Sequence, residues 1–310
     1  MRRAAAFAAL LFAAPAAAEP ISFIAIGDMP NGDPEIVLPA YEALIDVINA
    51  RDPALVIHVG DVKAVAAPCS DEALREQAAL LGRIAAPVLF TPGDNDWTDC
   101  HLEAAGAHDP RERLAFLRAA FFGEGRWSRR AEPEPLERQA KAGFPENTRL
   151  RPGPILFVTL HVVGSNNGFE SRNPEAVAEF FAREAAALAW LEESFAVAGD
   201  AAAVVVALHA DMFAEGFEPF PRERWQGGSG FARIGPALRD AALAYGKPVL
   251  LIHGDGHVFG LDRPLRRTAP NLFALEVFGA PDMHGVEITA DPARREVFSF
   301  APILNPAQPR

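Results

Sequence analysis

The chain has 310 residues, of which 50% are hydrophobic and 23% are charged. This is the composition of an ordinary globular protein, so it excludes a disordered, fibrous or low-complexity chain. The formal net charge of −12 repels polyanions, and we therefore expect no binding to nucleic-acid polymers.

Residues 1–18 have the pattern of a secretion signal. Two arginines come before an apolar stretch from Ala4 to Ala14, and small residues at positions 16–18 suit a cleavage site. No later apolar stretch reaches the roughly 20 residues that a membrane helix needs. We therefore expect an exported protein, periplasmic or extracellular, without membrane insertion.

Three strand–turn–helix units follow one another at the start of the mature chain. Each begins with a short apolar run and reaches a motif with Gly followed by Asp. The runs cover residues 21–26, 55–59 and 88–90, and helical patterns cover 37–50 and 71–84. Successive units of this kind predict a parallel sheet with right-handed crossovers, whose carboxyl edge is where ligands bind.

From residue 101 to 154 the pattern loosens, and we interpret this stretch as a surface excursion over that edge. Apolar runs and helical patterns then alternate again. The predicted strands cover 155–163, 202–208 and 248–252, and the predicted helices 111–121, 174–198 and 231–245. Alternating segments at 272–278, 285–289 and 296–300 suit antiparallel strands that complete a second sheet. We find no linker within 19–310, which predicts a single domain.

The ends of five predicted strands carry Asp or His side chains. They are Asp28, Asp61, Asp94, His209, Asp255 and His257. One such residue after a glycine is usually a turn or a helix cap, but five strand ends together favour a metal site. Six ligands exceed a four-coordinate shell, so we predict two divalent ions bridged by a carboxylate. The ligand types suit Mn, Fe or Zn, and the many carboxylates also suit Mg.

These motifs resemble those of the calcineurin-like metallophosphoesterases. That family has Asp-x-His, Gly-Asp, Gly-Asn-His-Asp/Glu, a lone His and Gly-His-x-His, each after a strand. In order and in strand context the resemblance covers residues 21–258. It implies an α/β fold, namely a four-layer αββα sandwich of two mixed β-sheets with flanking helices and a metal site at the strand carboxyl ends.

The chain departs from the family pattern at several of these positions. Pro30 stands at the first His, so one ion loses a ligand unless Asn31, Asp33 or water replaces it. Asn95 stands at the catalytic His, and an amide donates a hydrogen bond but no proton. Asp255 replaces the first His of Gly-His-x-His.

The resemblance implies metal-dependent hydrolysis of a small phosphomonoester or phosphodiester. In this reading Asp61 takes the bridging position, Asp94 replaces a metal-binding Asn, and Asn95 orients the phosphate. Water or His101 would protonate the leaving group, or it would depart without a proton donor. Because of Pro30 and Asn95, a catalytically impaired metal- or ligand-binding protein on the same fold is the alternative.

Two other side chains and one short segment near these motifs keep two interpretations each. His253 is either a core histidine or a residue that supports the metal ligands. Lys63, two residues after Asp61, either contacts a phosphate or is solvated. The segment 165–167, Ser-Asn-Asn, either lines the site or makes a turn.

Cys69 and Cys100 are the only cysteines. An exported protein meets an oxidising compartment, where two cysteines usually join. Each of them follows an acidic motif by a few residues, so both lie at one rim if the motifs do. The sequence therefore predicts a disulfide, with two separate small hydrophobic residues as the alternative.

Overall fold

The structure is a computed structural model, and it describes residues 19–123, 136–213 and 229–308. The predicted secretion signal at 1–18 lies outside the described residues. Within those described ranges, no helix is both long and apolar enough to span a membrane.

One sheet has five strands in the order β12-β11-β1-β2-β3. Its strands are β1 (Ile21–Ile26), β2 (Val56–His58), β3 (Val88–Phe90), β11 (Gly285–Ala290) and β12 (Phe298–Ile303). The first three are parallel, as the strand–turn–helix units predict. Strand β11 pairs antiparallel with β1, and β12 pairs antiparallel with β11, so this sheet is mixed. The tail segments expected at 285–289 and 296–300 thus extend the sheet of β1–β3 rather than complete the other one.

The other sheet has seven strands in the order β4-β5-β6-β7-β8-β10-β9. Its strands are β4 (Leu136–Gln139), β5 (Phe144–Leu150), β6 (Ile155–Thr159), β7 (Ala203–Ala207), β8 (Val249–His253), β9 (Gly260–Asp262) and β10 (Leu272–Glu276). Strands β6, β7, β8 and β10 are parallel, and the others are antiparallel to their neighbours. The tail segment at 272–278 thus runs parallel to β8, because the unpredicted strand β9 first reverses the chain.

Helices cover the outer faces of both sheets. They are α1 (Pro34–Arg51), α2 (Asp71–Leu81), α3 (Pro110–Phe122), α4 (Gly164–Asn167), α5 (Pro174–Ala198) and α6 (Ile234–Tyr245), with short 3-10 helices η1 (Thr98–His101), η2 (Glu103–Ala105), η3 (Ala140–Ala142) and η4 (Ser229–Phe231). Four starts are explained by side-chain caps, at Asp33, Ser70, Asp109 and Asn173. Proline follows the cap in α1, α3 and α5, where its missing N–H costs nothing.

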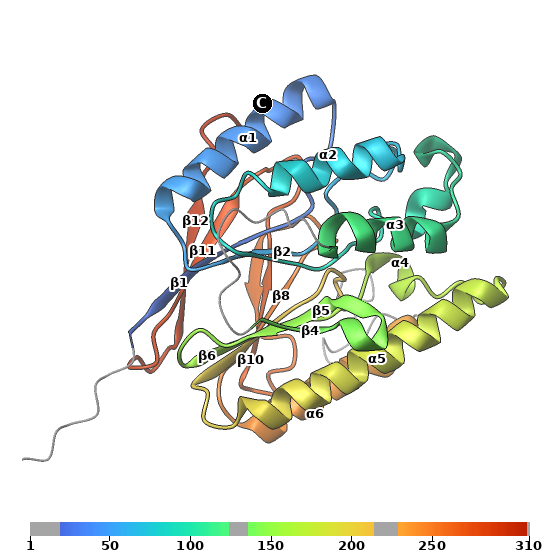
Figure 1. The fold of residues 1–310 in the computed structure, drawn as a ribbon. Coiled ribbons are helices and arrows are strands. Elements are labelled where there is room, and N and C mark those ends of the chain that lie inside the picture. Colours follow the sequence, from blue (N-terminus) through green and yellow to red (C-terminus); the bar gives the residue numbers. More distant parts are fainter. Residues whose placement is uncertain (1–18, 124–135, 214–228, 309–310) are drawn as a thin grey trace, which may run out of the picture.

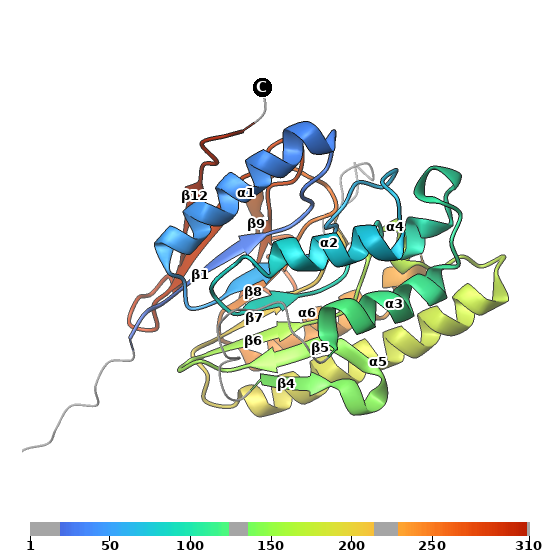
Figure 2. The same cartoon turned by 45° about the horizontal axis from the view of Figure 1, so that its top comes forward.

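Alternation along the strands produces four layers. In β1, Ile24 and Ile26 pack against the helices on one side, whereas Phe23 and Ala25 pack against the other sheet. Strand β7 alternates in the same way between α5, α6 and the layer between the sheets. Figures 1 and 2 show α1 and α2 on one side and α5 and α6 on the opposite side. The predicted αββα sandwich of two mixed sheets is confirmed.

The stretch expected to be a surface excursion, 101–154, instead contributes two strands to the second sheet. Strand β5 reads FPENTRL, and its polar residues Glu146, Asn147 and Thr148 are buried. Thr148 is satisfied there, because its backbone N–H donates to Thr159 Oγ1 at 2.8 Å. Hydropathy alone does not reveal a strand whose buried side chains are polar and hydrogen-bonded.

Candidate metal centre

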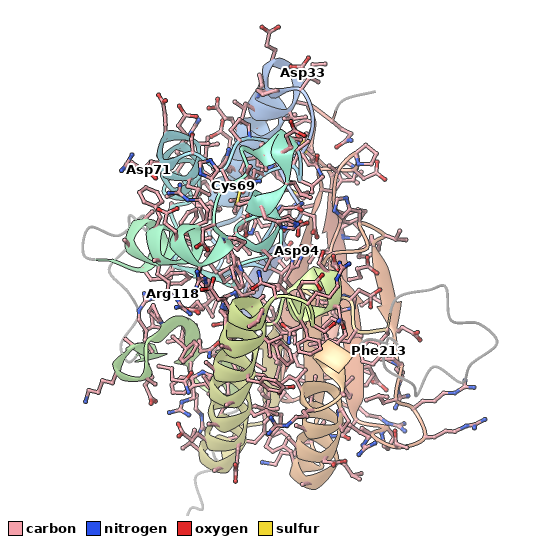
Figure 3. The ribbon with its side chains drawn as sticks, turned by 90° about the vertical axis from the view of Figure 1, so that its right-hand side faces the viewer. Asp33, Cys69, Asp71, Asp94, Arg118 and Phe213 are labelled. Atoms are coloured by element: carbon pink, nitrogen blue, oxygen red, sulfur yellow. A yellow bond between two sulfur atoms is a disulfide. The ribbon has the colours of Figure 1, made fainter. Side chains whose placement is uncertain are left out.

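The carboxyl ends of strands from both sheets meet at one edge of the molecule. The six predicted ligands lie there, namely Asp28, Asp61 and Asp94 after β1, β2 and β3, His209 after β7, and Asp255 and His257 after β8. Asp94 lies near the middle of Figure 3, with α5 and α6 below it. This edge carries the candidate site, as the strand order predicts.

Two overlapping groups of ligand atoms are close enough to hold metal ions. Asp28, Asp61 and His257 form one group, and Asp61, Asp94 and His209 form the other, with the ligand atoms of each group within 4.8 Å of one another. Asp61 belongs to both, which is the arrangement of a carboxylate that bridges two ions.

The distances around His209 extend the second group. Its Nε2 lies 3.0 Å from Asp94 Oδ1, 3.5 Å from Asp61 Oδ1 and 3.7 Å from Asp255 Oδ1. Nε2 of His257 lies 3.6 Å from Asp28 Oδ1. Three carboxylates therefore surround one ring nitrogen, an arrangement that a bound cation would stabilise.

Backbone carbonyls determine the tautomers of both histidines. Nδ1 of His209 donates to Val59 O, and Nδ1 of His257 donates to Ala280 O, each at 2.8 Å. A carbonyl oxygen only accepts, so Nδ1 carries the hydrogen in both rings and Nε2 faces the carboxylates. Metal-binding histidines are oriented in this way, by a hydrogen bond from the nitrogen that does not bind the ion.

Acidic groups outnumber histidines among the six candidate ligands, with four carboxylates against two imidazoles. Burial raises the pKa of Asp28 to about 6, partly offset by His209 and His257, and raises the pKa of Asp61 well above its usual range. Burial alone would lower the pKa of His209, but the carboxylates around it raise that pKa well above its usual value. Among the residues that the structure describes, Asp28 Oδ2 is buried without a hydrogen-bond partner. The donor set and this orphaned oxygen fit bound cations.

Four of the six candidate ligands have left-handed backbone. The φ angles are 54° at Asp28, 55° at Asp61, 75° at Asp255 and 61° at His257. Residues other than glycine seldom adopt this conformation, and such strain concentrates at functional sites. It is sustained by neighbouring loops, for instance where Asp28 N–H donates to Gly60 O at 2.9 Å. Turns alone do not require left-handed backbone at so many candidate ligands of one site.

Glycines bring the backbone up against the carboxylates. A Cβ at Gly93 would overlap Asp61 Oδ1, and a Cβ at Gly254 would overlap Asp28 Oδ2. The same holds at Gly164, where a Cβ would lie 2.7 Å from Asp94 Oδ2. The glycines of these motifs are therefore required by close approach to the ligands.

The segment from Gly164 to Asn167 closes one side of the centre. Ser165 Oγ donates to Asp94 Oδ2 at 2.7 Å. Burial opposes ionisation of Asp94, but the His209 ring beside it and the bond from Ser165 lower its pKa to about 2. The backbone is left-handed at three successive residues, with φ between 50° and 56°. The segment thus both turns the chain and contacts a candidate ligand.

Asp96 was not among the predicted site residues, although it holds together the two loops that carry Asp61 and Asp94. Its carboxylate accepts hydrogen bonds from the backbone N–H groups of Asp61 (3.0 Å), Val62 (2.9 Å) and Gly93 (2.8 Å). The available signal was its place at the end of Gly-Asp-Asn-Asp, where the family pattern has Asp or Glu.

A buried polar chain extends from the loop that carries Asp94. Trp97 Nε1 donates to His161 Nε2 at 3.1 Å, and His161 Nδ1 donates to Glu146 Oε1 at 2.8 Å. Arg118 in turn pairs with Glu146. Sequence reasoning missed His161 and Glu146, and the only signal was a histidine inside an apolar strand pattern. Since Trp97 is buried, it anchors the loop in the core.

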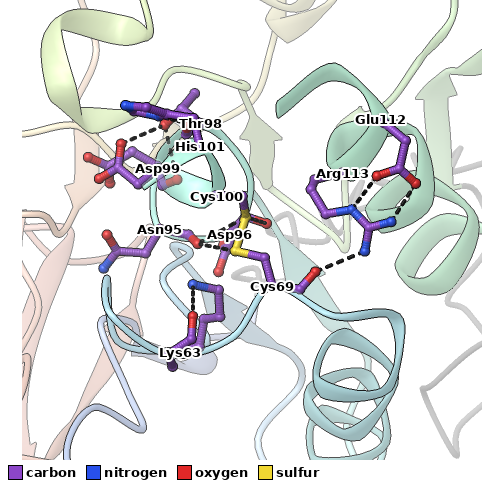
Figure 4. Close-up of a disulfide and its surroundings, with 12 residues drawn as sticks. Lys63, Cys69, Asn95, Asp96, Thr98, Asp99, Cys100, His101, Glu112 and Arg113 are labelled. Carbon is purple, nitrogen blue, oxygen red and sulfur yellow. Dashed lines mark hydrogen bonds and ion pairs between the residues drawn. A yellow bond between two sulfur atoms is a disulfide. The ribbon is translucent and has the colours of Figure 1, made fainter. Parts of the chain in front are cut away.

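Asn95 and Lys63 lie beside the disulfide in Figure 4. The Asn95 side chain points away from the disulfide, and its backbone N–H donates to Asp61 Oδ1 at 3.0 Å. Lys63 is 3% exposed, and its Nζ donates to the carbonyl oxygens of Ala64 and Ala67, each at 3.1 Å. Lys63 is thus neither solvated nor directed freely to a ligand in this conformation.

His253 and His101 differ in burial and in their hydrogen-bond partners. His253 is buried, which lowers its pKa, and its Nδ1 lies 3.2 Å from Gly254 O. His101 is exposed, and its Nδ1 donates to Thr98 O at 2.7 Å. Asp33, a suggested replacement ligand, caps α1 by accepting from Glu35 N at 3.0 Å. It is therefore engaged away from the centre.

The disulfide between Cys69 and Cys100 is present, with the Cα atoms 5.7 Å apart. The prediction of this bond is confirmed. Sγ of Cys69 and Sγ of Cys100 lie 3.9 Å and 4.0 Å from the backbone oxygen of Asn95. The disulfide therefore lies against the loop at Asn95 and Asp96, directly after Asp94 in the chain (Figure 4).

Comparisons with known proteins show similarity in structure. No protein-family model matches the sequence, and no curated protein matches it. Purple acid phosphatase PPD1 from yellow lupin (Lupinus luteus) seeds is similar with a TM-score of 0.53 and 11% identity over 92% of this chain and 54% of the phosphatase. The protein TT1561 of Thermus thermophilus is similar with a TM-score of 0.50 and 12% identity over 91% of this chain and 99% of TT1561. The chain thus spans about half the length of the lupin protein.

Proposed function

Because the chain has the fold of the calcineurin-like metallophosphoesterases, we propose that it is a metal-dependent phosphoesterase acting on a small phosphomonoester or phosphodiester. The observation that carries this proposal is the shared position of Asp61 between two groups of candidate ligands. Two ions that share one bridging carboxylate suit hydrolysis of phosphate esters.

Two sets of residues would hold the ions. Asp28, Asp61 and His257 would bind one, and Asp61, Asp94 and His209 the other, with Asp255 beside them. Carboxylates outnumber imidazoles, so Mn or Fe, and also Mg, suit the centre better than Zn. When bound, two such ions supply an acidified water and neutralise phosphoryl oxygens.

Asn95 would orient the phosphate through its side-chain amide. An amide cannot supply the proton that a departing alkoxide needs. Water or the exposed His101 would have to do so, and esters whose leaving groups are already stable anions should therefore react fastest.

The disulfide also supports the proposed location. Disulfides persist in oxidising compartments, and the bond between Cys69 and Cys100 agrees with the secretion signal expected at 1–18. We infer that the mature chain from residue 19 is exported to the periplasm or the exterior as a single domain.

Removing the metal is the direct test. We expect elemental analysis of the purified protein to find about two equivalents of transition metal per chain. Chelation should lower the rate of nitrophenyl phosphate hydrolysis by at least ~100-fold, and added Mn should restore it. Bound metal without hydrolysis of either the monoester or the diester would support the alternative, a catalytically impaired binding protein.

Replacing Asn95 with histidine tests how far the missing proton donor limits the enzyme. We expect Asn95→His to raise kcat for alkyl phosphates by about 10- to 100-fold, because a positioned acid assists poor leaving groups most. For nitrophenyl phosphate the gain should be below about threefold. Steady-state kinetics on both esters measure this, with Asn95→Gln as the control that keeps an amide. Equal gains on both esters would contradict this role for the position.

A further inference from the structure

We propose that a cavity beside the metal centre binds the leaving group of the substrate and favours neutral or positively charged leaving groups over anionic ones. This inference rests on the proposed function and adds the substrate class. The cavity has a volume of about 660 Å³ and lies between η1, the segment 165–170 and the first turns of α3 and α5.

The cavity and the metal centre share a wall. Ser165 and Thr98 both line the cavity. Ser165 Oγ donates to Asp94 Oδ2 at 2.7 Å, and Thr98 Oγ1 donates to Asp94 O at 3.0 Å. The side chains of Ser165 and Thr98 therefore connect Asp94 to the lining of the cavity.

Buried hydrogen bonds fix the segment 165–167, which carries Ser165 of the shared wall. Arg183 is fully buried and donates to Asn167 O at 2.8 Å, while also bonding Asn167 Oδ1. Asn167 Nδ2 donates to Gly230 O at 3.1 Å. These bonds sustain the left-handed backbone of residues 165–167, so the cavity has a defined shape rather than an adaptable one.

Carboxylates dominate the charged lining. They are Asp99, Asp109, Glu170, Glu175 and Glu179, against the cationic Arg111 and the imidazole of His101. Arg111 is already paired, at 3.0 Å with Asp109 and 2.6 Å with Glu175. Among the described residues, the lining therefore has no guanidinium that is free of a carboxylate partner and could bind an anion.

Asp99 is the carboxylate best placed to attract or repel a charged leaving group. It follows the metal-binding loop and accepts a hydrogen bond of 3.3 Å from Thr98 Oγ1. It makes no ion pair with any residue in the described ranges, and burial, with Asp94 nearby, raises its pKa. A cationic group in the cavity would stabilise the ionised Asp99 carboxylate, whereas an anionic group would be repelled by it.

An aromatic side chain supplies the apolar part of the wall. Phe169 lines the cavity and packs on Phe180 and Phe181, with ring centroids 4.8 Å and 6.0 Å away. Phe169 is only partly buried, so it offers apolar surface to an organic group. Aromatic rings beside carboxylates are suited to ammonium groups in particular. Phosphate esters of amino alcohols therefore fit the lining best.

The test compares three alkyl phosphates that differ in leaving-group charge. They are phosphocholine, glycerol 2-phosphate and 3-phosphoglycerate, assayed with Mn alongside nitrophenyl phosphate. We expect kcat/KM to fall in that order, by at least ~10-fold from the first to the last. Choline alone should also bind saturably in calorimetry, without added metal.

Two variants locate the preference in the cavity. Asp99→Asn should reduce the ratio of kcat/KM for phosphocholine to kcat/KM for 3-phosphoglycerate by about fivefold, and it should weaken choline binding. The control is Glu193→Gln, which removes one acid from the exposed face of α5 and should change neither. Ala176 lines the cavity, so Ala176→Trp, which places an indole there, should slow all three alkyl esters relative to methyl phosphate. Ala178→Trp, exposed two residues further on, should not.

The outcomes separate this inference from the proposed function. Hydrolysis of nitrophenyl phosphate with no charge preference, or with a preference that survives Asp99→Asn and Ala176→Trp, would overturn the leaving-group site alone. Absence of hydrolysis of every ester by the metal-loaded protein would overturn the proposed function and this inference with it.

Discussion

Asp61→Asn is expected to lower kcat/KM for nitrophenyl phosphate by about 10²- to 10³-fold and to reduce the bound metal from about two ions per chain to at most one. Asp61 belongs to both groups of candidate ligands, and a neutral amide does not bridge two cations as a carboxylate does. The variant should fold, because its remaining oxygen still accepts the Asn95 N–H that Asp61 Oδ1 accepts now. Kinetics and elemental analysis measure the two effects.

Asp46→Asn is the matched control for that substitution. Asp46 lies on the exposed side of α1, so the same chemical change there should leave metal content and kcat/KM unaltered. If Asp61→Asn kept two ions and full activity, the shared position of Asp61 would be irrelevant to function, and the dinuclear centre would have to be abandoned.

Asp28→Asn should stabilise the metal-free protein at neutral pH while removing the stabilisation that metal confers. The pKa of Asp28 is raised from 3.8 to about 6 by burial, so its ionisation disfavours the folded state. The resulting loss of free energy of unfolding is absent below pH ~4 and grows as the pH rises. It is complete above pH ~6, where it reaches about 3 kcal/mol. Asparagine carries no charge and so avoids it.

Thermal unfolding of the metal-free protein between pH 4 and pH 8 measures this effect. The melting temperature of the wild type should fall as the pH rises, and that of Asp28→Asn should fall less. Saturating Mn should raise the wild-type melting temperature most at neutral pH, because cations neutralise the carboxylates. Parallel pH profiles for wild type and variant would show that the buried charge of Asp28 is compensated within the protein.

Much of the fold could be predicted because hydrophobic runs and turn motifs repeat in a regular order. The three runs that reach Gly-Asp motifs became β1, β2 and β3 in one parallel array. The helix expected at 174–198 has those bounds in α5. Asp28, Asp61 and Asp94 were found together for the same reason, since carboxyl ends of adjacent parallel strands share an edge.

The parts that sequence reasoning missed depend on partners distant in the chain. Glu146 is a buried acid in β5 that becomes acceptable only through His161 and Arg118. Ser165 reaches Asp94 only because three left-handed residues turn the chain toward it. Neither periodicity nor local propensity encodes such contacts, because both describe neighbours along the sequence.

The close approach of Gly93, Gly164 and Gly254 to the carboxylates has a consequence for affinity. These side chains have no room to swing apart when no cation is present, so mutual repulsion persists in the metal-free state. Ions would enter an arrangement that is already assembled, with little loss of conformational entropy on binding. Relief of that repulsion would then add directly to the strength with which the chain retains its metals.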